Sequence, residues 1–289
     1  SMKWLLRSVA GWPLGLVAFV GGSLGWLTWL ASPTYRRRLA ANATLAGLNS
    51  TQRRQSVAEI GRLFLEVPWL WFRDRQRPIL PLIRAWHGTE HVEEALRAGR
   101  GLVLLTPHLG CFEMSACAYA ERFGPTQPIT VLYRPAKQPW LADVQTTART
   151  APHMQAAPAS LSGVRQMIRA LRKGETLGLL PDQVPPEGQG AWAPFFGQPA
   201  YTMTLAARLV QQTGCAVLLT WCERLPGAQG FVMHYAPLPS ALPKGDEAAA
   251  AAINAAMEWT IRHIPHQYLW GYNRYKGPRS LPATPEAGA

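Results

Sequence analysis

The chain has 289 residues, enough to bury one large core or two small ones. With 48% hydrophobic and 16% charged residues it is more apolar than an ordinary soluble domain, and its twelve tryptophans suit a membrane interface or wide apolar grooves. The formal net charge of +12 fits anionic lipid, an acidic protein or nucleic acid, but no nucleic-acid-binding motif accompanies it. The four cysteines match neither zinc-ligand spacing nor a secreted disulfide framework. We therefore expect reduced thiols in the cytoplasm, no metal, no cofactor and no nucleic-acid partner.

The N-terminal segment reads as a membrane anchor. Residues 8–35 carry no charge, and about 20 apolar residues suffice to cross ~30 Å of hydrocarbon. The run of three arginines at 36–38 is the heavier basic flank, so the positive-inside rule predicts that the following domain is cytoplasmic. A hairpin or an interfacial helix is an alternative, because Pro13 and Gly21-Gly22 can break a helix, and a cleaved signal peptide is another. We predict a membrane-attached segment over residues 1–35.

Beyond the anchor, helical and strand patterns alternate. The predicted helices span residues 35–48, 52–72, 90–98, 112–123, 139–150, 160–172, 201–213 and 247–263. The predicted strands span residues 102–106, 129–133, 176–180, 216–222 and 230–235. This order predicts an α/β fold over residues 36–277, with a mainly parallel central sheet covered by helices on both faces. Residues 278–289 read as a flexible tail.

The strongest chemical motif follows the strand at 102–106. His108 and Glu113 stand five positions apart there, at a strand's carboxyl end, where reactive groups gather in open α/β sheets. On one helix they would point about 140° apart, so their pairing requires His108 in a turn and Glu113 in the first helical turn. A neutral imidazole can then take a proton from an attacking hydroxyl while the carboxylate fixes its tautomer. The alternative is a helix-capping histidine with a glutamate favourably placed near the helix N-terminus.

This H-x4-E motif resembles that of the lipid A biosynthesis acyltransferases, part of a wider group of glycerolipid H-x4-D/E acyltransferases. Three more blocks are similar to that family's signatures in the same order: YRP at 133–135 with QP at 138–139 and Arg149, LPDQ at 180–183 with PFFG at 194–197, and QYLW at 267–270 with RYK at 274–276. The similarity covers nearly the whole chain. The residues at 273–275 depart from the paired basic residues and Phe that are commoner there.

The resemblance implies a membrane-bound O-acyltransferase with a glycerolipid-acyltransferase-like fold. It would move a fatty acyl chain from an acyl carrier protein thioester to a hydroxyl of a lipid A precursor, as a late secondary acylation at the cytoplasmic face of the bacterial inner membrane. The net charge of +12 agrees with an acidic carrier, a phosphorylated acceptor and anionic inner-membrane lipids. The alternatives are a lysophospholipid or other glycolipid as acceptor, acyl-CoA as donor, or a non-catalytic membrane scaffold.

Roles for the charged residues follow from the resemblance. We expect His108 to be the general base and Glu113 its partner. Arg149 would stabilise the thioester oxyanion or hold a phosphate, unless it is a solvated arginine at a helix end. Arg134 would hold a phosphate or the carrier's phosphopantetheine, with a surface salt bridge as the alternative. Asp182 would orient Arg149 or a donor group, with a simple turn as the alternative.

Apolar and C-terminal positions complete the candidate set. Phe195, Phe196 and Gly197 would line an acyl groove, unless they only pack the core. Arg274 and Lys276 would contact the carrier or a phosphate, or else remain tail charges. Cys111 lies inside the H-x4-E motif, but we expect it to pack as a small hydrophobe and not to form an acyl-cysteine.

Overall fold

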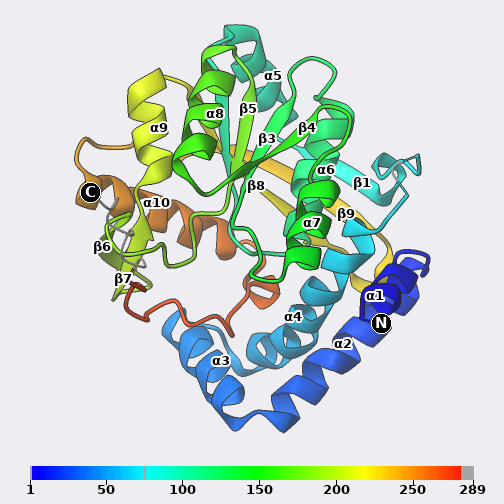
Figure 1. The fold of residues 1–289 in the computed structure, drawn as a ribbon. Helices are drawn as coiled ribbons and strands as arrows, with labels where there is room; N and C mark the ends of the chain where they lie inside the picture. The colour runs from blue at the N-terminus through cyan, green and yellow to red at the C-terminus, as the bar shows by residue number, and fades with distance from the viewer. Residues whose placement is uncertain (1, 75, 281–289) are drawn as a thin grey trace, which may run out of the picture.

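The computed structural model describes residues 2–74 and 76–280, and Figure 1 shows their arrangement. Residues 281–289, most of the predicted flexible tail, lie outside the described residues. A central sheet occupies the middle of the molecule, and the first four helices lie along one side of it.

The central sheet has seven strands in the order β1-β9-β8-β2-β5-β3-β4, and only the β8–β9 pair is antiparallel. The prediction of a mainly parallel sheet is confirmed, and all five predicted strands are present. The strands are β1 (Ile83–His87), β2 (Leu102–Leu105), β3 (Ile129–Tyr133), β4 (Met154–Pro158), β5 (Thr176–Leu179), β8 (Ala216–Arg224) and β9 (Phe231–Pro237).

The strands that the sequence did not predict lie at the margins of the fold. β1 and β4 are the two edge strands, and their mixed burial gives no continuous apolar run. β6 (Gly190–Phe195) and β7 (Gln198–Met203) form a separate hairpin. Residues 201–203, predicted to begin a helix, therefore end β7, and α9 starts only at Leu205.

Helices cover both faces of the sheet. In the fully buried β2, Leu102 and Leu104 pack in the cluster that contains Met114 of α6, whereas Val103 and Leu105 pack in the cluster of α8, α9 and α10. The alternation follows from the two-residue repeat of a strand. These helices are α5 (Thr89–Ala98), α6 (Phe112–Arg122), α7 (Pro139–Ala148), α8 (Leu161–Arg172), α9 (Leu205–Thr213) and α10 (Asp246–Ile261).

The predicted anchor consists of two helices, α1 (Met2–Val9) and α2 (Leu14–Ala31), with the break just before Pro13 as the sequence allowed. Gly21-Gly22 do not break α2. Within the described chain, α2 is the helix long and apolar enough to cross a membrane, with a mean hydropathy of 1.6. It is followed by α3 (Pro33–Leu45) and α4 (Ser50–Trp71).

α2 does not stand apart from the domain but lies antiparallel along α4 (Figure 1). Trp69 of α4 donates a hydrogen bond to the carbonyl oxygen of Trp12, and Arg62 donates to that of Ala18. At the other end Gly25 faces Gly61, and a Cβ on Gly25 would lie 2.2 Å from the carbonyl oxygen of Val57. Small residues therefore allow the two backbones to meet.

A buried ion cluster holds α4 on the sheet. Arg224 of β8 donates to both carboxylate oxygens of Glu66, at 2.5 and 2.6 Å, and to Glu59 at 2.6 Å. Arg224 is 7% exposed and Glu66 is 3% exposed. Burial opposes the charge on Arg224, but the two carboxylates outweigh burial and raise the pKa of the guanidinium. The ions thus fix α4, and α2 with it, against β8 of the central sheet.

Candidate active site

Two neighbouring parallel strands bring His108 and Asp182 together. In the register between β2 and β5, Leu105 is opposite Leu179. His108 and Asp182 each follow three residues after those partners, so both lie at the carboxyl edge of the sheet. The Nδ1 atom of His108 hydrogen-bonds Oδ1 of Asp182 at 2.8 Å, and the His108 backbone N–H donates to Oδ2 at 2.9 Å.

Asp182 is a buried, ionised hydrogen-bond acceptor. It is 2% exposed and also accepts a bond from the Tyr268 hydroxyl at 3.1 Å. Burial acts to raise the pKa of Asp182, but the imidazole of His108 and the hydrogen bonds from His108 and Tyr268 hold it below its ordinary value. Since a carboxylate only accepts, Nδ1 carries the proton, and Nε2 is left as the basic ring nitrogen.

The structure does not pair His108 with Glu113 as the sequence predicted. Glu113 lies in the first turn of α6, and its Oε1 accepts a bond from Nη2 of Arg149 at 2.5 Å. The His108 ring instead packs on Phe112, with 4.8 Å between ring centroids. His108 lies in the turn before α6, beside β5, whereas Glu113 is directed to the end of α7. The carboxylate that contacts the His108 ring is therefore that of Asp182.

Arg149 follows the last residue of α7, at the helix C-cap. Its guanidinium lies between the Glu113 carboxylate and the Trp71 ring, 5.2 Å from the ring centroid. Its Nε is buried and has no hydrogen-bond partner in residues 2–74 and 76–280. A buried donor without an acceptor is costly, and such a donor beside a cavity suits a ligand oxygen. Asp182, predicted as a partner for Arg149, contacts His108 instead.

The C-terminal QYLW block holds the turn that carries His108. The backbone N–H of Leu269 donates to the His108 carbonyl oxygen at 3.2 Å, and Gly110 N–H donates to the Gln267 carbonyl oxygen at 3.0 Å. Gly110 has φ +59°, and a Cβ there would lie 2.0 Å from the carbonyl oxygen of Cys222, so glycine is required. Sequence reasoning did not find this positioning role, because the contacts join residues about 160 positions apart, with no local signal.

A cavity of about 260 Å³ opens beside this histidine. Its lining includes His108, Arg134, Gln145, Arg149 and Gln183. Arg134 follows the end of β3 and is one of the residues that line the cavity. It makes no ion pair with any described residue, so its charge is available to a ligand. A narrow apolar cleft behind Phe112 adjoins the cavity, and Phe112, Arg149 and Leu180 line both.

Phe195, Phe196 and Gly197 do not line the His108 cavity, so the predicted acyl-groove role is not met. Phe195 ends β6, and Phe196 and Gly197, both with positive φ, form the turn to β7. Phe195 is 2% exposed and packs on Tyr268 and Tyr275, while Phe196 N–H donates to Glu258 of α10. Phe195 and Phe196 have the alternative role of packing the core, whereas Gly197 is exposed in the turn.

Arg274 also has a structural role. It is 3% exposed and donates to the Tyr201 carbonyl oxygen and the Thr202 hydroxyl, at 2.6 and 2.8 Å. Lys276 lies over the Tyr272 ring. Cys111 is buried, and burial with the nearby Glu66 raises the pKa of its thiol, which disfavours a reactive thiolate.

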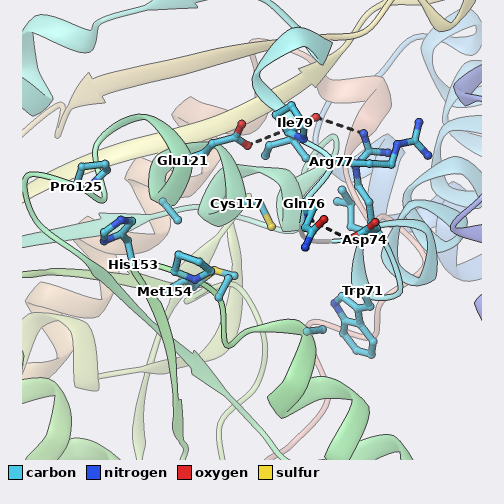
Figure 2. Close-up of a pocket in the computed structure, with 17 residues that line it drawn as sticks. Trp71, Asp74, Gln76, Arg77, Ile79, Cys117, Glu121, Pro125, His153 and Met154 are labelled. Atoms are coloured by element: carbon cyan, nitrogen blue, oxygen red, sulfur yellow. Dashed lines mark hydrogen bonds between the residues drawn. The ribbon is translucent and has the colours of Figure 1, made fainter.

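Trp71 also lines a second cavity, of about 360 Å³ (Figure 2). Its lining includes Asp74, Arg77, Glu121 and His153, and Glu121 accepts a bond from the Ile79 backbone N–H. His108 and Asp182 do not line it. The catalytic geometry therefore selects the smaller cavity as the candidate active site.

Fold and site together define an α/β enzyme in which a carboxylate-oriented histidine lies beside arginine donors. Residues 3–277 match the model of a family described as bacterial lipid A biosynthesis acyltransferase, so the chain belongs to that family and is an acyltransferase. It is 26% identical to the lipid A biosynthesis palmitoleoyltransferase of Escherichia coli K12, over 91% of this chain and 86% of the relative. It is also 26% identical to the lauroyltransferase of that strain, over 82% of this chain and 77% of the relative. A lipid A biosynthesis acyltransferase of Haemophilus influenzae is 24% identical over 93% of this chain and 87% of the relative.

Proposed function

We propose that this chain transfers a fatty acyl group from an acyl carrier protein thioester to a hydroxyl of a lipid A precursor. The observation that carries the proposal is the hydrogen bond between His108 and the ionised Asp182, beside a cavity that Arg134 and Arg149 line. Membership of the lipid A biosynthesis acyltransferase family supports the substrate class.

In the proposed reaction Nε2 of His108 takes the proton of the acceptor hydroxyl as its oxygen attacks the thioester carbonyl. Asp182 accepts the Nδ1–H bond and stabilises the imidazolium that forms. Arg149, held by Glu113, donates to the oxyanion of the tetrahedral intermediate. The intermediate collapses by breaking the C–S bond, and the departing thiolate takes the proton back from His108. Arg134 binds a phosphate of the donor's phosphopantetheine or of the acceptor.

We place this reaction at the cytoplasmic face of the bacterial inner membrane. The apolar α2, followed by the arginines at 36–38, supports this orientation by the positive-inside rule. The net charge of +12 supports contact with acidic carrier protein and anionic membrane lipids.

The test is an assay of purified protein with a mixture of acyl carrier protein thioesters and a tetra-acylated, phosphorylated lipid A precursor. Mass spectrometry reads the product for wild type, His108→Ala and Asp182→Asn. We expect one acyl addition in wild type and a loss of ~10²- to 10⁴-fold in rate in both variants. Acylation of a lysophospholipid in place of the precursor would reassign the acceptor, and transfer unaffected by either substitution would overturn the mechanism.

A further inference from the structure

A long apolar groove separates part of the membrane helix from the body of the protein. Its volume is about 510 Å³, and α1, α2, α3, α4 and α7 contribute to its walls. Along α4 and its C-cap the lining runs from Ile60 to Phe72, about 18 Å of helix. None of the described residues that line the groove is charged. Shape and chemistry therefore suit an extended hydrocarbon chain.

Gly25 of α2 and Gly61 of α4, which are in contact, also line the groove. Phe64 of α4 and Leu24 of α2 line it and remain 57% and 45% exposed. The opposite face of α2 is apolar and open, with Phe19 and Leu27 at 72% and 61% exposure. Because that outer face faces the bilayer under the proposed function, a hydrocarbon chain can move from the membrane into the groove without crossing water.

Two elements lead from this groove to the catalytic cavity. Trp71 at the end of α4 lines the groove, and Arg149 lies over its ring at 5.2 Å and lines the His108 cavity. On α7, Leu141 lines the groove, and Gln145, one turn later, lines the His108 cavity. A lipid whose chain lies in the groove would therefore present its polar end near Arg149.

The junction at Trp71 also offers an unused polar atom. The indole Nε1 of Trp71 is buried and has no hydrogen-bond partner among the described residues. Figure 2 shows the Trp71 ring from the side of the second cavity, which it also lines. A buried indole N–H normally finds an acceptor, and a carbonyl or hydroxyl oxygen at the head of an acyl chain would supply one.

We propose that this groove binds an acyl chain of the lipid acceptor. The chain enters the groove laterally from the bilayer, and the polar end of the acceptor extends past Trp71 to His108. The inference rests on the proposed function and adds the place where the acceptor's hydrocarbon lies. The groove, Trp71 and Leu141 then select an acceptor that already carries long acyl chains.

Photolabelling tests the binding directly. Full-length protein is placed in phosphatidylglycerol vesicles that contain a phospholipid with a diazirine in its acyl chain, irradiated, and mapped by mass spectrometry. We expect label in the groove at Phe64 and Leu141 as well as on the outer face at Phe19 and Leu27. Adding a tetra-acylated, phosphorylated lipid A precursor should remove the groove label and leave the outer label. If the groove label persists when the precursor is added, the groove holds structural membrane lipid. If the groove is not labelled even without precursor, it is closed to lipid. Either result overturns the inference.

A matched pair of substitutions on α2 gives a second test. Thr28→Trp fills the groove, whereas Leu27→Trp adds the same ring one residue away on the outer face. We expect Thr28→Trp to abolish the groove label and raise KM for the precursor about tenfold, with KM for the thioester unchanged. Leu27→Trp should keep the groove label. Equal groove labelling in both variants contradicts the inference.

The labelling result is independent of catalysis. His108→Ala should still show competition by the precursor although it transfers nothing. If the precursor displaces the groove label but wild type transfers no acyl group to it, the inference about the groove stands and the proposed function is overturned. If wild type transfers an acyl group but the precursor does not displace the label, only the inference about the groove is overturned.

Discussion

At the scale of single residues, the site contains two hydrogen-bonded pairs, His108 with Asp182 and Glu113 with Arg149. In the proposed reaction the first pair is a base of defined tautomer and the second is a fixed guanidinium. Both pairs are largely buried, so each carboxylate depends on its partner to replace lost solvation.

Glu113 and Arg149 should act as one unit. We expect Glu113→Gln and Arg149→Met each to lower kcat by about 10²-fold, because the guanidinium loses its position or is removed. The double variant should be no worse than either single one, which a double-mutant cycle of kcat measures. Glu121→Gln, on the same helix but outside the His108 cavity, serves as the control. Additive losses would mean that the two residues act separately.

The stability contributed by Asp182 should depend on pH. Its folded-state pKa lies below the ordinary value of about 3.9, so the stabilisation is complete above that value and is lost as pH falls through the folded-state pKa. We expect the difference in melting temperature between wild type and Asp182→Asn to be widest near neutral pH and to narrow progressively as the pH falls below about 4. Thermal unfolding in detergent measures it. A constant difference down to about pH 3 would contradict an ionised Asp182.

At the scale of elements, the carboxyl ends of β2, β5 and β3 place His108, Asp182 and Arg134 at one edge of the sheet. α4 links this edge to α2, since Trp71 of α4 supports Arg149 and α4 lies along α2, while the buried ions fix α4 on β8.

Removing the central cation of that cluster should destabilise the fold. Arg224→Met leaves Glu66 without a cation in the interior and leaves Glu59 with Arg62 alone, so we expect a loss of about 3–5 kcal/mol in unfolding free energy. The matched control is Arg208→Met, which breaks an exposed pair with Asp246 and should leave stability nearly unchanged. Chemical denaturation in detergent compares them. Equal stability of the two variants would show that the buried cluster is not structurally important.

At the scale of the whole molecule, α1 and α2 give one side a continuous apolar face. Trp4, Phe19, Leu27 and Leu30 are each more than half exposed there. Because α2 lies along α4 and α4 lies on the domain, this entire side, and not one isolated helix, would face the bilayer.

The free energy of membrane binding should therefore combine burial of apolar side chains with a salt-sensitive attraction to anionic lipids. We expect sedimentation with phosphatidylglycerol vesicles to persist at high salt, and the preference for anionic over neutral vesicles to fade. Phe19→Asp and Leu27→Asp should each weaken binding at least tenfold, since burying such a side chain contributes about 1.5–3 kcal/mol. Leu161→Asp, exposed on α8, is the control. Release of wild type by salt alone would show that only charge holds it.

The local pattern of the chain determined much of this protein. Apolar runs gave the buried strands β2, β3 and β5, because strands covered on both faces need apolar side chains throughout. Pro13 marked the break between α1 and α2, and the motif blocks marked His108, Asp182 and Arg149 as candidate site residues. All of these signals come from residues near one another in the chain.

Only the tertiary structure decided which of those residues meet. The order of strands places β5 beside β2, so that His108 forms its hydrogen bond with Asp182. Glu113 forms its hydrogen bond with Arg149 instead. The same holds for Tyr268, whose hydroxyl reaches Asp182 across 86 positions, and for Gly25, which is needed because Val57 lies against it. Hydrogen bonds and close contacts form between neighbours in space, and strand order is set by packing of the whole core, which no local spacing encodes.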